Sequence, residues 1–183
     1  GVVCIAGTGA NTFGINRHGQ RARADGLGPL LGDRGSGYWI GENTLRAACR
    51  ANDGSGPDTA LLDGVLRQMQ VEDVDGLVAT VYAPDFQRDR VAALVPVVLE
   101  CAAAGDAVAR EILTAAGREL AATALAVLRT VGVLPVAVHG GVLNRQSPVR
   151  EAFEATLRAA VSGILIQEPQ HDAAYGAALL PQL

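Results

Sequence analysis

The sequence has 183 residues, of which 49% are hydrophobic, and this length and composition predict one large globular domain with a substantial core. Its net charge is −4, so the composition favours neither nucleic acid nor an anionic membrane surface as a partner. All 15 basic residues are arginines, which excludes a P-loop lysine and a Schiff-base lysine within these residues. Any phosphate must therefore be held by backbone groups, hydroxyls, arginine or a metal ion.

The three cysteines, Cys4, Cys49 and Cys101, lie far apart in apolar segments. Their odd number and wide spacing are typical of buried thiols in a reducing compartment. Neither they nor the three histidines have the spacing of a metal or cluster site, so no metal ligand is predicted. The sequence shows no apolar run of about twenty residues and no signal-peptide pattern, and we expect a cytoplasmic protein.

The first part of the chain has strand and turn patterns. Residues 2–6 form an apolar run of the kind found in strands that are buried on both faces. Residues 12–17 and 21–24, joined by a turn at residues 18–20, predict a β-hairpin. Because Gly1 is not an initiator methionine and a core strand follows at once, we expect a further segment upstream.

The remainder alternates helical and strand patterns. We expect helices over residues 36–50, 58–70, 73–82, 86–104 and 106–130. We then expect a strand over 133–138, a helix from Ser147 to about residue 161, a strand over 163–166 and a closing helix over 171–180. A hairpin, a group of helices and a βαβα unit together predict one α/β domain.

Three glycine-rich segments can bring backbone N–H groups close to a ligand. Residues 7–11 (Gly-Thr-Gly-Ala-Asn) follow the first strand, and residues 140–144 (Gly-Gly-Val-Leu-Asn) follow the strand over 133–138. Between them, the loop over 27–41 carries Asp33, which can cap the next helix or accept hydrogen bonds from hydroxyls. Taken singly, each segment also fits an ordinary turn. His139 either faces a ligand site or is a partly buried histidine.

In this order, the three segments resemble the acetate and sugar kinase, heat-shock chaperone and actin superfamily. Within it, they resemble the BadF/BadG/BcrA/BcrD ATPase family, which includes the N-acetylglucosamine kinases. The resemblance covers nearly the whole chain, 1–183, as a single carboxy-terminal lobe. It implies an α/β ribonuclease H-like, actin-like ATPase lobe with a mixed sheet and packed helices. It also implies transfer of the γ-phosphoryl of ATP to the 6-hydroxyl of N-acetylglucosamine or a related amino sugar such as glucosamine, with ATP and Mg²⁺ as cofactors.

The resemblance assigns nucleotide contacts to two segments and part of a third. Gly7, Thr8 and Gly9 match the second phosphate motif, in which Thr8 faces the nucleotide phosphates. Gly140 and Gly141, with Asn144 nearby, match the adenosine motif, where missing side chains leave room for the nucleoside. The stretch from Ala102 to Gly105 matches the other wall of the adenine pocket.

The resemblance also assigns sugar contacts. Ala10 and Asn11 match positions near the sugar. Gly26, Leu27, Gly28 and Asp33 match the positions that hold it, with Asp33 accepting hydrogen bonds from sugar hydroxyls. The chain departs from the family pattern at two places. Leu27 stands where such kinases usually have a tryptophan. Arg34 stands where the loop commonly has a glutamate, and we expect its side chain to point to solvent rather than to an anionic group.

No catalytic residue is assigned within these 183 residues. In kinases of this kind the first phosphate motif and the aspartate general base belong to an amino-terminal lobe, and nothing in this sequence matches either. We therefore expect an isolated chain with little or no activity, which has the amino-terminal lobe and an amino sugar as partners; a homodimer is left open. Two alternatives remain: an ATPase activator of a 2-hydroxyacyl-CoA dehydratase, which needs a cluster-binding cysteine pair between subunits, and a non-catalytic sugar- or nucleotide-responsive module.

Overall fold

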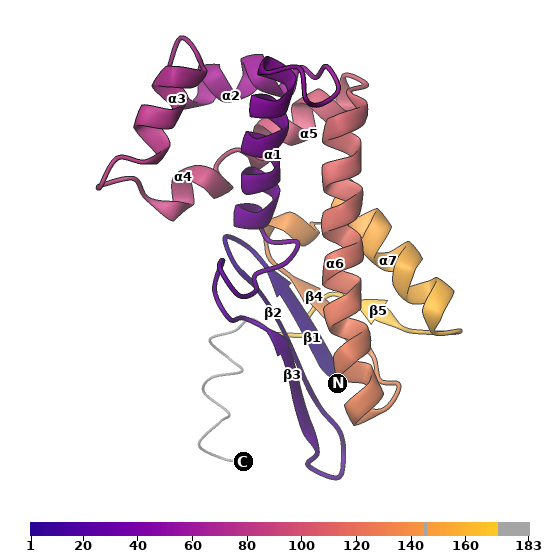
Figure 1. Ribbon diagram of the computed structural model, residues 1–183. Helices are drawn as coiled ribbons and strands as arrows, with labels where there is room; N and C mark the ends of the chain where they lie inside the picture. Colours follow the sequence, from indigo (N-terminus) through magenta and orange to yellow (C-terminus); the bar gives the residue numbers. More distant parts are fainter. Residues whose placement is uncertain (145, 172–183) are drawn as a thin grey trace.

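The protein is described by a computed structural model over residues 1–144 and 146–171. Its centre is a five-stranded mixed sheet in the order β3-β2-β1-β4-β5 (Figure 1). The strands are β1 (Val2–Ala6), β2 (Ala10–Ile15), β3 (Arg21–Asp25), β4 (Val136–His139) and β5 (Ile166–Gln167). The first three strands pair in antiparallel fashion, whereas β1, β4 and β5 run parallel. The predicted α/β class and mixed sheet are confirmed.

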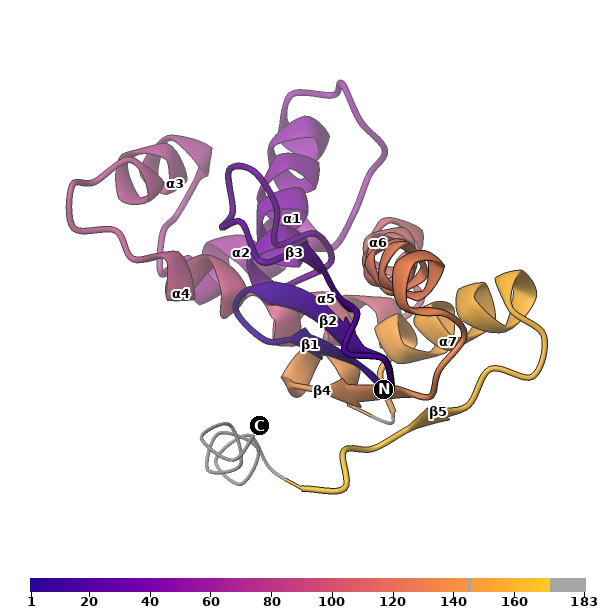
Figure 2. The same ribbon diagram turned by 90° about the horizontal axis from the view of Figure 1, so that it is seen from below.

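The helices are concentrated at one end of the sheet and along one side of it (Figures 1 and 2). They are α1 (Gly37–Asn52), α2 (Leu61–Met69), α3 (Val74–Val81), α4 (Arg88–Ala92), α5 (Val95–Ala103), α6 (Ala107–Val131), the 3₁₀ helix η1 (Gly141–Leu143) and α7 (Pro148–Ala160). Helices α1 to α5 form a group beyond the end of the sheet, and α6 runs from this group down along β1, β2 and β3. Helix α7 packs against α6, so the two helices cover one side of the sheet.

Helix α6 has 25 residues and supplies a large share of the buried core residues. Its apolar residues recur every three or four positions, and those that are fully or almost fully buried include Leu113, Ala116, Leu120, Ala124 and Val127. They face β1 residues such as Cys4, which is completely buried. The helix predicted over 106–130 is therefore confirmed in place, length and buried face.

Several expected boundaries are wrong. The helix predicted over 86–104 is divided into α4 and α5, because the chain turns at Ala93 and Leu94 and Pro96, in the first turn of α5, has no N–H for a continuing helix. The last strand lies at Ile166–Gln167 instead of 163–166. The helix expected over 171–180 lies almost wholly outside the described residues.

Strand β1 is buried on one face and partly open on the other, contrary to the expectation of burial on both faces. Val2, Cys4 and Ala6 point toward the core that α6 shares, whereas Ile5 on the opposite face is 38% exposed. Among the residues that the structure describes, α6 packs on the face that carries Val2, Cys4 and Ala6.

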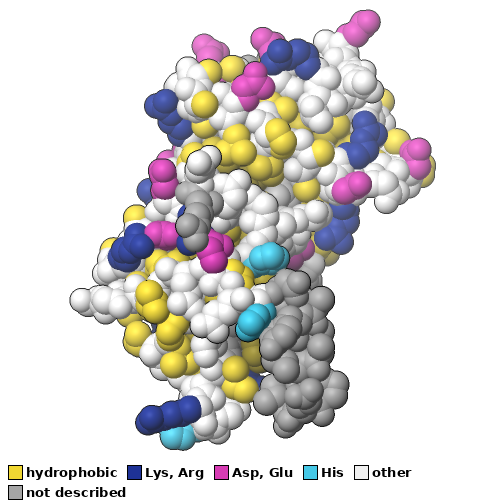
Figure 3. Space-filling view, turned by 180° about the vertical axis from the view of Figure 1, so that it is seen from behind, with side chains coloured by type: hydrophobic (Ala, Val, Ile, Leu, Met, Phe, Trp, Pro, Cys, Tyr) yellow, Lys and Arg dark blue, Asp and Glu magenta, His cyan; other side chains and the backbone are white. Residues whose placement is uncertain are grey.

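The surface shown in Figure 3 carries acidic and basic side chains interspersed with one another, and apolar side chains gather over the helical end. Among the described residues, no helix combines the length and apolar character needed to cross a membrane.

Asp106 joins two parts of the helical group. Its carboxylate accepts hydrogen bonds from Ala109 N (2.8 Å) at the start of α6, and from Thr59 Oγ1 (2.8 Å) and Ala60 N (2.7 Å) ahead of α2. Partial burial acts to raise the pKa of this carboxyl, but these donors outweigh burial and hold the pKa below its usual value of 3.8.

Replacing Asp106 with alanine is expected to lower the free energy of unfolding at pH 7 by about 2 kcal/mol, since both a helix cap and an interhelical link are lost. A carboxyl with a lowered folded-state pKa stabilises the protein above its unfolded pKa and loses that contribution as the pH falls through the folded value. The difference between Asp106→Ala and wild type should therefore shrink below pH 3.8. Urea unfolding of both proteins at several pH values measures this difference in the free energy of unfolding. A difference that does not change with pH would contradict this account.

Candidate functional site

The turn between β1 and β2 is tied to the start of α1. Gly7 N donates to Gly9 O (2.9 Å), and the carbonyl oxygens of Gly7 and Thr8 accept hydrogen bonds from Gly37 N (2.7 Å) and Tyr38 N (3.1 Å). This leaves Thr8 exposed at the tip of the turn, at the carboxyl end of β1. The predicted phosphate segment is thus a rigid turn that presents a hydroxyl to solvent.

The first N–H groups of α1 are all used within the protein. Besides the bonds from Gly37 and Tyr38, Trp39 N donates to Ser36 Oγ (3.2 Å), which caps the helix. Helix N-termini otherwise offer such N–H groups to anions. In this protein the N–H groups of Gly37 and Tyr38 hold the β1–β2 turn instead. Any phosphate would therefore be contacted by the turn and not by the start of α1.

Gly140 and Gly141 follow β4, the parallel neighbour of β1. Gly140 has a φ of +105°, and a Cβ atom built on it would overlap the carbonyl oxygen of Ala6 at the end of β1. A Cβ atom on Gly141, in contrast, would have no atom within 4 Å. The first glycine therefore allows the two strand ends to touch, and the second faces open space.

Two cavities adjoin the segment that follows β4. One of about 590 Å³ is lined by Val138, His139, Gly140, Gly141, Leu143, Asn144 and Glu168. The other, of about 610 Å³, is lined by Leu99, Ala102, Ala103, Arg110, Thr114, Asn144, Gln146, Ser147, Pro148 and Glu151. Asn144 lines both cavities, so the structure brings together the predicted nucleoside residues from the β4 end and from α5. His139 is exposed and lines the first cavity, and Arg110 Nε donates to Ala102 O (3.0 Å) in the second.

Asp33 is buried against the β1–β2 turn. Its Oδ1 accepts a hydrogen bond from Ala10 N (3.1 Å), and a Cβ atom on Gly9 would lie 3.0 Å from the same oxygen. Its Oδ2 lies 3.6 Å from Arg88 Nη2. Asp33 has a φ of +56°, a left-handed conformation that is unusual for a residue other than glycine. The structure therefore places the predicted sugar-binding carboxylate directly beside the predicted phosphate turn.

Asp25, at the end of β3, organises the loop that carries Asp33. Its buried carboxylate accepts hydrogen bonds from Gly26 N (2.8 Å), Asp33 N (2.5 Å) and Arg34 N (3.0 Å). Sequence reasoning missed this residue. The available signal was an aspartate followed directly by glycine at the end of a strand, a pairing typical of turns built around a carboxylate.

Arg34 is exposed, in line with the expectation that it points to solvent, and it also pairs with acidic groups of the chain. Its Nε lies 3.5 Å from Asp25 Oδ2 and its Nη1 lies 3.6 Å from Glu119 Oε2 on α6, although the side chain is 51% exposed. Arg34, at the position where the loop commonly has a glutamate, therefore connects the loop to α6.

The remaining predicted sugar residues lie along the same loop and strand. Asn11 Oδ1 accepts a hydrogen bond from Arg23 Nε (3.1 Å), and Arg23 Nη2 donates to Gly26 O (2.6 Å). Gly28 O accepts from Gly32 N (2.7 Å), closing the loop, and Leu27 is 63% exposed. Leu27 thus presents an apolar side chain to solvent at the position where a tryptophan is usual.

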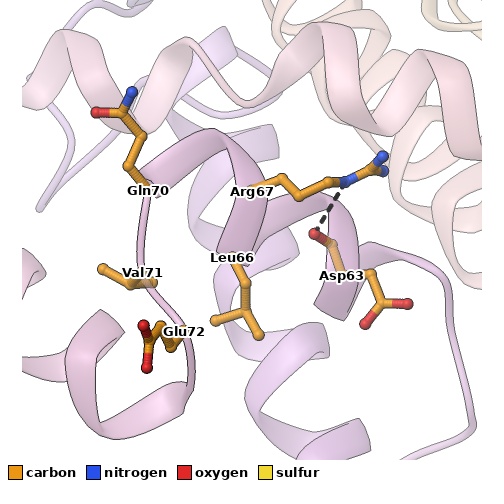
Figure 4. Close-up of a pocket in the computed structure, with 6 residues that line it drawn as sticks. All are labelled: Asp63, Leu66, Arg67, Gln70, Val71 and Glu72. Carbon is orange, nitrogen blue, oxygen red and sulfur yellow. Dashed lines mark hydrogen bonds between the residues drawn. The ribbon is translucent and has the colours of Figure 1, made fainter.

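A further hollow on α2 contains none of the predicted site residues. It is lined by Asp63, Leu66, Arg67, Gln70, Val71 and Glu72, and Arg67 Nε donates to Asp63 O at 3.3 Å across its rim (Figure 4). The charged side chains point outward from one short helix and the connection after it. The candidate site is therefore the carboxyl edge of the sheet and not this hollow.

Metal-binding groups do not gather among the residues that the structure describes. Within 1–144 and 146–171, no three His, Cys, Asp or Glu side chains form an arrangement that could hold a metal ion. The cysteines lie on β1, α1 and α5. Burial raises the pKa of Cys4 to about 11, which disfavours the thiolate form that metals require.

Two curated proteins that resemble this chain over nearly its whole length are sugar kinases. The chain is 34% identical over 186 residues to the N-acetyl-D-glucosamine kinase of Dictyostelium discoideum, covering 98% of this chain and 58% of that protein. It is 30% identical over 184 residues to the N-acetylmuramic acid/N-acetylglucosamine kinase of Clostridium acetobutylicum, covering 98% of this chain and 60% of that protein. The chain thus spans about three fifths of the length of these curated relatives.

Solved structures agree with the fold. A proposed N-acetylglucosamine kinase from Chromobacterium violaceum superposes with a TM-score of 0.80 at 29% identity, covering 98% of this chain and 59% of that one. A proposed N-acetylglucosamine kinase from Porphyromonas gingivalis, at 20% identity and a TM-score of 0.67, shows the same fold over 93% of this chain and 56% of its own length. The likeness confirms the actin-like ATPase fold. The model of the BadF/BadG/BcrA/BcrD ATPase family matches residues 1–181, and the chain belongs to that family.

Proposed function

We propose that this chain provides the nucleotide contacts and the sugar-holding carboxylate of an ATP-dependent kinase that phosphorylates an amino sugar, N-acetylglucosamine or glucosamine. The observation that carries the proposal is the convergence of three segments distant in sequence. The β1–β2 turn and the Gly140–Gly141 segment follow adjacent parallel strands, and Asp33 packs directly on that turn. Ligands of α/β proteins bind at this edge, where strands end.

The nucleotide is proposed to run from the β1–β2 turn to the two cavities. Thr8 would contact phosphate oxygens through its hydroxyl, and the open space over Gly141 would admit the nucleoside. Ala102 and Asn144, which line the same cavity, would lie on either side of the adenine. This path uses backbone and small side chains, which suits a chain that contains no lysine.

The amino sugar is proposed to bind through Asp33. An ionised carboxylate has about four lone-pair positions, and the described contacts of Asp33 are the N–H of Ala10 and the guanidinium of Arg88. Acceptor positions therefore remain for sugar hydroxyls. Because these hydroxyls would lie next to the phosphate turn, the sugar and the γ-phosphoryl group would be held as neighbours, which is the main requirement of phosphoryl transfer.

The general base is proposed to come from a second lobe. The two aspartates of the predicted sugar loop, Asp25 and Asp33, both hold backbone N–H groups and pair with arginines, so neither is assigned as the base. Kinase Mg²⁺ is bound by one or two carboxylates together with substrate phosphates. Both carboxylates already pair with arginines, so Mg²⁺ enters the proposal only with ATP. We expect the 183-residue chain to bind its ligands without catalysing efficient phosphorylation.

The dehydratase-activator alternative has no support from the cysteines: a cluster shared between two subunits needs thiols at the surface, whereas Cys4 and Cys101 are buried and Cys49 is half-buried. The non-catalytic module would share the ligands proposed above and differs only in lacking phosphoryl transfer.

Calorimetric titration of the chain with N-acetylglucosamine, glucosamine and glucose, each with and without ATP and Mg²⁺, tests the proposal. We expect selective binding of one amino sugar, weakened about tenfold or more in Asp33→Ala because hydrogen bonds to a charged acceptor are lost. ATP affinity should be unchanged. Asp58→Ala, which removes an exposed carboxylate from the α1–α2 connection, is the matched control.

Absence of sugar binding, or equal affinity in wild type and Asp33→Ala, would contradict the sugar site. Sugar phosphorylation by the 183-residue chain at the rate of an intact sugar kinase would contradict the need for a second lobe.

A further inference from the structure

Arg88 approaches the candidate sugar site from the helical group. It is the first residue of α4, 55 positions after Asp33 in sequence, and its Nη2 lies 3.6 Å from Asp33 Oδ2. Its guanidinium carbon also lies 5.6 Å from the ring centroid of Tyr38, on the first turn of α1. The arginine side chain is 57% exposed, whereas that of Asp33 is 8% exposed. One cation therefore contacts the buried carboxylate from its solvent side.

The two oxygens of Asp33 have different partners. Oδ1 is fixed by the backbone N–H of Ala10, at 3.1 Å, and Arg88 is the cation beside Oδ2. A carboxylate held at one oxygen can still tilt and turn about the bond to its Cβ atom, since rotation of this terminal bond has broad minima. A second contact at the other oxygen restricts that motion. The direction of the remaining lone pairs then depends on both partners.

We infer that Arg88 is a positioning residue for the sugar: by pairing with Oδ2 of Asp33, it orients the carboxylate that accepts hydrogen bonds from the sugar hydroxyls. The inference rests on the proposed role of Asp33 and adds the residue that sets its orientation. Arg88 acts through Asp33 and is not assigned to the reacting atoms.

The ion pair between Arg88 and Asp33 also connects the proposed sugar site to helices α3 and α4. Arg88 and Tyr38 both line a cavity of about 550 Å³ between α1, α3 and α4, whose apolar wall includes Leu77, Phe86 and Val91. Movement of α4 relative to α1 would change the distance between Arg88 and Asp33. The affinity for the sugar therefore depends on the position of a helix that itself contributes no predicted sugar contact.

Arg88→Gln is expected to weaken binding of the proposed amino sugar about fivefold, the change that corresponds to loss of a partly exposed ion pair. ATP affinity and the midpoint of thermal unfolding should stay at the wild-type values. Arg88→Lys should recover part of the loss, because it keeps the charge and lacks the planar fork. The matched control is Arg90→Gln: Arg90 is exposed on the same helix and lies 5.0 Å from the Phe86 ring centroid, and its described contacts do not include Asp33.

Two further readouts separate positioning from a general structural role. Raising the salt concentration from about 0.05 to 0.5 M should weaken the binding of uncharged N-acetylglucosamine to the wild-type protein, because screening weakens the exposed ion pair. The same change should not affect sugar binding to Arg88→Gln, which lacks the pair. In a double-mutant cycle, Arg88→Gln should have no effect on sugar affinity in a protein that already carries Asp33→Asn.

The outcomes distinguish the two proposals. If wild type binds the sugar, Asp33→Ala weakens it, and Arg88→Gln binds as wild type does, the positioning role is wrong and the sugar site stands. Equal losses in Arg88→Gln and Arg90→Gln would also overturn the positioning role. If wild type binds no amino sugar, the proposed function fails and the role of Arg88 falls with it.

Discussion

Replacing Gly140 with alanine is expected to lower the free energy of unfolding by about 3–5 kcal/mol, because the new Cβ combines backbone strain with a steric overlap. The residue has a φ of +105°, and its Cβ would meet the carbonyl oxygen, carbonyl carbon and amide nitrogen of Ala6. These are backbone atoms of β1, which is paired on both sides and cannot move away as a flexible side chain could. The ends of β1 and β4 would have to separate.

Gly141→Ala is the matched control. Its Cβ would have no neighbour within 4 Å, so the stability should change by about 0.5 kcal/mol or less. If the nucleoside occupies this open space, the same substitution should weaken ATP binding. Urea unfolding and calorimetry measure the two effects. Equal stabilities of the two variants would show that the close approach of Gly140 to Ala6 does not hold the strand ends together.

Replacing Asp25 with alanine is expected to cost about 2–4 kcal/mol in unfolding free energy and to abolish detectable sugar binding. The carboxylate accepts hydrogen bonds from three N–H groups, those of Gly26, Asp33 and Arg34, and pairs with the Arg34 side chain. Without it, buried donors lose their acceptor. The left-handed backbone of Asp33 also loses the contact that fixes it, so the sugar-binding carboxylate is no longer held against Ala10.

Arg34→Gln separates the ion pairs from the backbone bonds. It removes the contacts of a half-exposed guanidinium with Asp25 and Glu119 and should cost less than about 1 kcal/mol. Sugar affinity should stay near the wild-type value. Chemical unfolding and sugar titration of both variants decide the matter; an Asp25→Ala protein that still binds the sugar would show that the loop does not depend on this carboxylate.

Local patterns predicted the helices α6 and α7 well, because each has one clearly apolar face. The periodicity of α6 placed its core residues correctly, and Ser147 caps α7 as expected, since its Oγ accepts from Val149 N at 3.2 Å. The patterns failed where contacts with other helices and strands determine where an element ends or which residues are buried. An uninterrupted apolar run over residues 91–99 spans the break between α4 and α5, so the pattern gave no sign of it. The exposure of Ile5 depends on which face α6 covers.

The glycines and Asp33 of the candidate site could be selected from the sequence because each follows a recognisable strand or precedes a helix. Their convergence could be expected only from the parallel pairing of β1 with β4. Asp25 and Arg88 were missed for different reasons. Asp25 acts on a residue eight positions later through a loop without periodicity, and Arg88 comes from a helix whose place relative to Asp33 depends on tertiary packing. Sequence spacing does not encode either contact.

The attachment of the β1–β2 turn to α1 has a consequence for motion. Amides in the first turn of a helix usually exchange their hydrogens quickly, because they have no partner in the helix. Here the amides of Gly37 and Tyr38 bond to the carbonyls of Gly7 and Thr8, so they exchange only when the turn separates from the helix. Fraying of α1 and opening of the turn are consequently one event. A ligand that steadies the turn would thus slow exchange at the beginning of a helix it does not touch.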